Sequence, residues 1–139
     1  MGIWYNQIMK ILISAGYAGF LNSLVKYLET TCKDVEIRGC QYTEQAIQEI
    51  ENGFQPDVIL TDYKYPFGKL NGDDYLKTLR TKGITAPAFL IIGSVSNEIS
   101  NAIRRQEFPN IPDVVVVRKD WSDFKKAIDF IHNQGILTA

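Results

Sequence analysis

The sequence predicts an α/β fold with one doubly wound, five-stranded parallel sheet. Short apolar runs alternate along the chain with segments in which hydrophobic residues recur at helical spacing. Four of the five runs are hydrophobic almost without interruption, which is typical of strands buried on both faces. With right-handed crossovers between strands, the expected order across the sheet is 2-1-3-4-5.

The expected strands occupy residues 8–13, 35–37, 58–60, 88–92 and 114–117. The second run alternates apolar and charged residues from Val35 to Arg38, so we expect it at an edge of the sheet. In a sheet of this order, a ligand crevice is expected at the carboxyl ends of the first and third strands.

Each expected helix carries an apolar stripe along one side. Gly53 and Gly83 stand where a glycine commonly ends a helix. Asp73 and Asp74 place negative charge at a helix start, and Ser122 is predicted to cap the last helix. The stripes are Leu21, Leu24, Val25 and Leu28; Ala46, Ile47 and Ile50; Leu76 and Leu79; Ile99, Ala102 and Ile103; and Phe124, Ala127, Ile128 and Ile131.

The composition is that of an ordinary globular domain, with 139 residues of which 45% are hydrophobic and 22% charged. A formal net charge of −1 indicates no direct nucleic-acid binding. Cys32 and Cys40 match no metal-binding spacing and are expected to be reduced thiols. The sequence lacks an apolar run long enough for a membrane span and shows no secretory signal pattern, so we expect a cytoplasmic protein without membrane contact.

The expected domain covers residues 9–133, because Met9 resembles a natural start. Residues 1–8 are then an N-terminal extension, and residues 134–139 form a C-terminal tail. We find no repeats and no long Pro-, Gly- or Ser-rich linker that would divide the chain.

Polar side chains stand at the ends of three successive apolar runs. Asp62 ends the third run, Ser94 closes the fourth and Lys119 closes the fifth. Since the carboxyl ends of parallel strands meet at one edge of the sheet, a carboxylate, a hydroxyl and an ammonium group are expected to converge there.

This set resembles the phosphoacceptor site of bacterial response-regulator receiver domains, which have a flavodoxin-like fold. The stretch from Pro56 to Asp62 is similar to the family's third strand, and Pro66 follows as in the family. The family's Asp/Asn-Gly pair follows slightly late, as Asn71-Gly72. Val116 stands where many members carry an aromatic residue, and its expected place is the core of the sheet.

The resemblance implies that Asp62 accepts a phosphoryl group, with Ser94 and Lys119 stabilising the transferred charge. In the family Mg²⁺ is held by the acceptor, by a backbone carbonyl, here that of Lys64, and by an acidic pair after the first strand. Ala15 and Gly16 stand at the positions of that pair and supply no carboxylate. We therefore expect weak Mg²⁺ binding at best, and phosphorylation of Asp62 that is weakened or absent.

The function implied is that of an atypical single-domain receiver in a two-component phosphorelay. It is not expected to be an enzyme beyond self-phosphorylation of Asp62 from a phosphodonor. It would act by protein–protein interaction, with a histidine kinase or a downstream signalling protein as partner. The surface implied for partner binding includes Ile103, Arg104, Phe108, Trp121 and Lys125.

A second interpretation uses the same first loop. Residues 14–19 come close to a G-x-G-x-x-G pattern between a strand and a helix, and Glu36 stands where a ribose-binding acid would be expected. The chain would then be a small Rossmann-like nucleotide- or phosphate-binding domain that uses the loop from Gly16 to Gly19.

Overall fold

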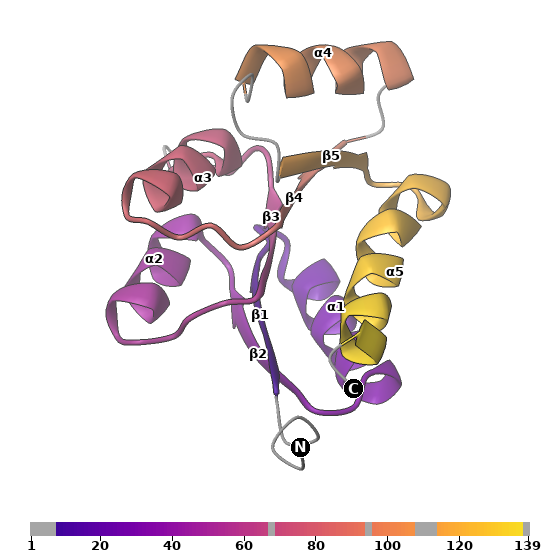
Figure 1. Cartoon of the computed structure of the whole chain (residues 1–139). Coiled ribbons are helices and arrows are strands. Elements are labelled where there is room, and N and C mark those ends of the chain that lie inside the picture. The colour runs from indigo at the N-terminus through magenta and orange to yellow at the C-terminus, as the bar shows by residue number, and fades with distance from the viewer. Residues whose placement is uncertain (1–7, 67–68, 94–95, 108–113, 138–139) are drawn as a thin grey trace.

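Five strands and five helices alternate along the chain in the computed structural model, which describes residues 8–66, 69–93, 96–107 and 114–137 (Figure 1). The strands are β1 (Met9–Ser14), β2 (Val35–Cys40), β3 (Val58–Asp62), β4 (Ala88–Ile92) and β5 (Val114–Arg118). The helices are α1 (Ala18–Thr31), α2 (Thr43–Glu51), α3 (Gly72–Thr81), α4 (Asn97–Glu107) and α5 (Trp121–Leu137).

The strands form one parallel sheet in the order β2-β1-β3-β4-β5, which confirms the predicted fold class and topology. The alternating strand β2 lies at an edge, as expected from its charged positions. Helix α5 continues to Leu137, past residue 133. The assignment of residues 1–8 and 134–139 to an extension and a tail stays a prediction.

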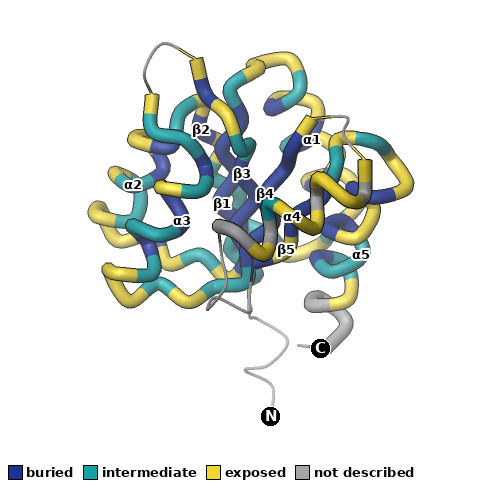
Figure 2. Tube along the Cα trace, turned by 90° about the horizontal axis from the view of Figure 1, so that it is seen from above, coloured by how far each residue is buried: buried dark blue, intermediate teal, exposed yellow. Residues whose placement is uncertain are grey.

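Helices cover both faces of the sheet, with α1 and α5 on one side and α2 and α3 on the other (Figure 1). Successive residues of a strand point to opposite faces, so each strand contributes to two cores. Leu28 of α1 and Ile128 of α5 pack with Ile13 and Leu60, whereas Leu76 and Leu79 of α3 belong to the second core. Figure 2 shows the buried strands at the centre of this sandwich. Val116 is buried in the second core, as predicted.

Helix ends follow the predicted glycines but not the predicted serine. Gly53 and Gly83 have φ angles of 106° and 83° just past α2 and α3, in the left-handed region that glycine adopts without strain. The Ser122 cap prediction is wrong. α5 begins at Trp121, and the Asp120 carboxylate accepts the N–H of Asp123 at 3.0 Å, so Asp120 caps the helix.

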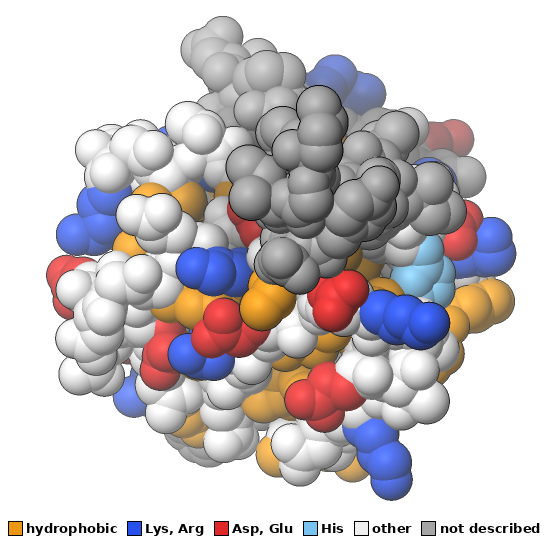
Figure 3. Space-filling model, turned by 60° about the horizontal axis from the view of Figure 1, so that its bottom comes forward, with side chains coloured by type: hydrophobic (Ala, Val, Ile, Leu, Met, Phe, Trp, Pro, Cys, Tyr) orange, Lys and Arg blue, Asp and Glu red, His pale blue; other side chains and the backbone are white. Residues whose placement is uncertain are grey.

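The surface carries charges of both signs. On the coloured part of the face in Figure 3, Lys and Arg side chains are interspersed with Asp and Glu, and no large area of one sign is visible. Within the described ranges, no helix is long and apolar enough to cross a membrane.

Candidate functional site

Asp62 lies at the carboxyl end of β3, in the centre of the sheet, where the loops after β1 and β3 meet. Its Oδ2 atom accepts a hydrogen bond from the backbone N–H of Gly16, with a distance of 3.0 Å between the nitrogen and the oxygen. Burial raises the pKa of the Asp62 carboxyl, and the Gly16 hydrogen bond and the charge of Lys119 only partly offset that effect. The hydrogen bond from Gly16 thus fixes the carboxylate in a partly buried position where its ionised form is less stable than in water.

Lys119 lies close enough to Asp62 to favour its ionised form, but the two side chains do not form an ion pair in the part of the chain that the structure describes. Instead, the Lys119 ammonium lies over the ring of Phe20 from α1, with Nζ 4.2 Å from the ring centroid. The Lys119 ammonium is therefore held by an aromatic ring of α1, and its charge still acts on the Asp62 carboxylate. Ser94 lies outside the described residues, so its role stays a prediction.

The positions of the missing acidic pair have two different environments. Ala15 is fully buried and packs in the core between the sheet and helices α1 and α5. Gly16 is partly exposed and faces Asp62 through its N–H. Over the described ranges, no three His, Cys, Asp or Glu residues come together in a way that could hold a metal ion. The Lys64 side chain lies on the Tyr63 ring, 4.5 Å from its centroid, and the role of the Lys64 carbonyl stays a prediction.

Tyr65, which the sequence patterns do not single out, is hydrogen-bonded to the backbone of Asp62. Its hydroxyl donates to the carbonyl oxygen of Ser14 at 2.9 Å and accepts the N–H of Asp62 at 3.2 Å. The Oγ1 atom of Thr61 lies 2.9 Å from the same hydroxyl. Burial raises the pKa of Tyr65 to about 12, so the phenol stays neutral and remains a donor. A buried tyrosine hydroxyl usually needs a hydrogen-bond partner. A tyrosine placed shortly after a buried strand was therefore the sequence signal that could have indicated this contact.

The Asn71-Gly72 pair holds the loop after β3 in place. Asn71 Oδ1 accepts the backbone N–H of Tyr65 at 2.9 Å, and the N–H of Gly72 donates to the carbonyl oxygen of Tyr63 at 2.8 Å. A Cβ atom at Gly72 would overlap the carbonyl oxygen of Asp62. Glycine is therefore required because the helix α3 starts against the backbone of the acceptor.

Two groups that the nucleotide-binding interpretation requires are already engaged in other contacts. The Gly16 N–H is bonded to Asp62, and the Glu36 carboxylate pairs with Arg38 at 2.7 Å. At the start of α1, a Cβ atom on Gly19 would lie 3.0 Å from the Tyr17 ring, so the ring lies against Gly19. A carboxylate beside the loop also disfavours a phosphate there.

The residues implied for partner binding lie on α4 and α5. Ile103 is partly buried against the second core, and Lys125 is exposed and pairs with Asp129. Trp121 is 59% exposed and packs edge to face on Tyr27 of α1, so the implied surface extends to α1. The Arg104 side chain and Phe108 lie outside the described part of the chain.

Comparison with known proteins identifies the fold. No protein-family model and no curated protein sequence matches the chain. Solved structures do. A response regulator receiver domain protein from Clostridium thermocellum is 21% identical, covers 95% of this chain and 100% of its own, and has a TM-score of 0.69. The chemotaxis response regulator CheY4 of Vibrio cholerae is 15% identical, with 91% of this chain and 98% of that one covered and a TM-score of 0.70.

The chain has the fold of a response-regulator receiver domain. The predicted resemblance is confirmed at the level of the fold. A structure described as adenylate cyclase from Rhodopirellula baltica matches equally well, at 22% identity, with 94% of this chain and 91% of that one covered and a TM-score of 0.70. Because the fold accommodates proteins with different descriptions, the function of this receiver fold has to be argued from its site.

Asp62→Asn is expected to raise the free energy of unfolding by ~1 kcal/mol near neutral pH, since it removes a partly buried charge and keeps the acceptor for Gly16. A raised pKa in the folded state means that the ionised form costs stability above that pKa. The gain should therefore disappear as the pH falls below the ordinary value of 3.8. Urea unfolding of both proteins across this pH range measures it, and a destabilised variant at neutral pH would contradict the expectation.

Proposed function

We propose that the chain is an atypical receiver in two-component signal transduction that acts by protein–protein interaction. Phosphorylation of Asp62 is weakened or absent in it. The observation that carries the proposal is the Asp62 pocket: one partly buried carboxylate held by the Gly16 amide, with Lys119 nearby. Among the described residues, no three His, Cys, Asp or Glu side chains come together there to hold a metal ion.

The pocket supports phosphoryl transfer in its simplest form. With Oδ2 bonded to Gly16, the other carboxylate oxygen of Asp62 can attack phosphorus in line. The new O–P bond forms as the bond to the leaving group breaks, and the leaving group takes the electron pair. Lys119 stabilises the negative charge on the transferred group, while the Gly16 N–H holds Oδ2 of Asp62.

The same pocket lacks the strongest stabiliser that this chemistry uses. Mg²⁺ would neutralise phosphoryl charge, but it needs several oxygen ligands in octahedral geometry, and in the described ranges no three His, Cys, Asp or Glu side chains come together to supply them. Removal of one electrostatic stabiliser typically slows such a step by a factor of ~10²–10³. We therefore expect slow transfer that depends little on divalent cations.

A small phosphodonor tests this directly. The chain is incubated with phosphoramidate, in Mg²⁺ or in EDTA, and the phosphoryl adduct is followed by intact mass. We expect an adduct that forms slowly or not at all, and at similar rates in the two solutions. Asp62→Asn should abolish any adduct, whereas Asp57→Asn is the matched control, because Asp57 is an exposed carboxylate at the other end of β3. A fast adduct that requires Mg²⁺ would contradict the proposal.

The partner class is tested in the same assay with autophosphorylated histidine kinases as donors. If docking uses the residues on α4 and α5, a cognate kinase should bind the chain with the same affinity whether Asp or Asn stands at position 62. If the chain binds none of the histidine kinases and none of the downstream signalling proteins tested, the proposed role in protein–protein interaction is contradicted.

A further inference from the structure

A side chain, rather than the backbone, joins the ends of β1 and β3. The ladder between these strands ends at the pair Ser14 and Thr61. Beyond it, the Tyr65 hydroxyl donates to the Ser14 carbonyl and accepts the Asp62 N–H, at 2.9 and 3.2 Å. The Thr61 hydroxyl lies 2.9 Å from the same phenol oxygen and donates to the carbonyl oxygen of Asp62 at 3.0 Å. The ring is therefore fixed in position between the two strand ends.

The fixed ring borders the space beside Gly16. A Cβ atom added at Gly16 would lie 3.5 Å from Cδ2 of Tyr65 and 3.6 Å from Cδ of Pro66. These are ordinary contact distances, so a first side-chain atom fits. A carboxyl group beyond it would have to share the space with a ring that its hydrogen bonds hold in place.

The other position of the missing acidic pair offers no substitute. Ala15 is fully buried and belongs to the apolar core between the sheet and helices α1 and α5, where a carboxylate would be costly to bury. Of these two positions, Gly16 is therefore the one from which a second carboxylate could join Asp62.

We propose that Tyr65 determines the ion specificity of the Asp62 pocket. Its ring occupies the space that a second carboxylate at position 16 would need, and its hydroxyl holds the two strand ends in place of a cation. In this proposal the Asp62 pocket is held together by hydrogen bonds and does not need a divalent metal ion for its structure. This inference rests on the proposed function in taking Asp62 as the functional carboxylate, but its claim concerns ion binding alone.

The test is a Mn²⁺ titration of the full chain, with free Mn²⁺ measured by electron paramagnetic resonance. The proteins are the wild type, Gly16→Asp, and Gly16→Asp combined with Tyr65→Met. We expect the first two to bind equally weakly and the combined variant to bind at least ~10-fold more tightly, because changes to the groups around metal ligands typically alter affinity by a factor of ~10–100. Addition of Asp62→Asn to the combined variant should remove the gain.

A fourth variant separates the ring from the hydroxyl. Gly16→Asp with Tyr65→Phe keeps the ring and should still bind weakly. Thermal unfolding monitors the fold of each protein. If the combined variant fails to fold, Gly16→Asp with Tyr65→Leu takes its place.

Two results would overturn the proposal. Gly16→Asp alone could bind Mn²⁺ as tightly as the combined variant, which would mean that the ring excludes nothing. All variants could bind equally weakly, which would mean that Tyr65 does not decide the specificity. Neither result depends on phosphorylation or on a kinase, so failure here is distinguishable from failure of the proposed function.

Discussion

Gly72→Ala is expected to lower the free energy of unfolding by ~3 kcal/mol or more, the largest effect of a single methyl group that the structure predicts. The added Cβ would overlap the carbonyl oxygen of Asp62 and would lie 2.8 Å from Cδ1 of the buried Leu90. The carbonyl belongs to a central strand and cannot move without disturbing the sheet. Helix α3 would instead have to shift away from the end of β3.

The shift would reach the pocket as well as the core. The Gly72 N–H that now donates to Tyr63 would be displaced, and with it the loop that carries Tyr65. Urea unfolding gives the stability. Gly93→Ala is the matched control, since a Cβ atom there meets nothing within 4 Å, and it should change the free energy by ~0.5 kcal/mol or less. Equal effects of the two variants would show that the close contact at Gly72 is not rigid.

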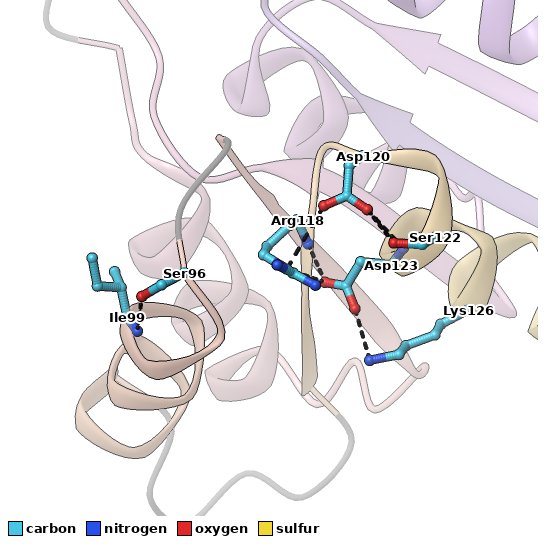
Figure 4. A network of polar contacts seen from close by, with 7 residues as sticks. All are labelled: Ser96, Ile99, Arg118, Asp120, Ser122, Asp123 and Lys126. Carbon is cyan, nitrogen blue, oxygen red and sulfur yellow. Dashed lines mark hydrogen bonds and ion pairs between the residues drawn. The ribbon is translucent and has the colours of Figure 1, made fainter.

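Asp123→Ala is expected to lower the free energy of unfolding by ~2–3 kcal/mol, because it removes the centre of a charged network at the start of α5 (Figure 4). The Asp123 side chain is buried and accepts the Arg118 N–H at 2.5 Å and the Lys126 ammonium at 2.7 Å. Its loss would leave both donors without this partner. The network ties the end of β5 to the first turns of α5, so the loop that carries Lys119 should also loosen.

The effect of Asp123→Ala should depend on pH. Burial alone would raise the pKa of Asp123, but the bonds from Lys126 and Arg118 outweigh it and lower the pKa below the ordinary 3.8. A lowered pKa in the folded state contributes stability above the ordinary value, and that contribution is lost as the pH falls through the folded value. The difference between wild type and variant should therefore shrink in acid.

Asp129→Ala provides the comparison on the same helix. Asp129 pairs with Lys125 at 2.8 Å, but both side chains are about half exposed, so its removal should cost only ~0.3–0.5 kcal/mol. Denaturant unfolding of the three proteins at neutral and acidic pH measures both effects. An Asp123 variant no less stable than the Asp129 variant would contradict the prediction.

Parts of the site were predictable because they follow from local pattern. A buried strand that ends in a carboxylate placed Asp62, and the acidic pair Asp73 and Asp74 marked the start of α3. The absence of carboxylates at Ala15 and Gly16 was likewise readable from the sequence. In each case the signal lies within one element or at its end, where hydrophobic period and turn chemistry operate.

Other parts were not predictable, since their partners lie far away in the chain. Lys119 rests on Phe20 of α1, a contact that no local pattern encodes.

The sequence by itself determined the sheet, its strand order and the place of Asp62 at the end of β3, because alternation of buried strands and amphipathic helices leaves few arrangements. The tertiary structure alone decided what surrounds that carboxylate. The bonds from Gly16 to Asp62 and from Tyr65 to Ser14 join residues 46 and 51 positions apart. Such contacts form only when separate strands pack side by side, so the chemistry of the pocket is a property of the packed sheet.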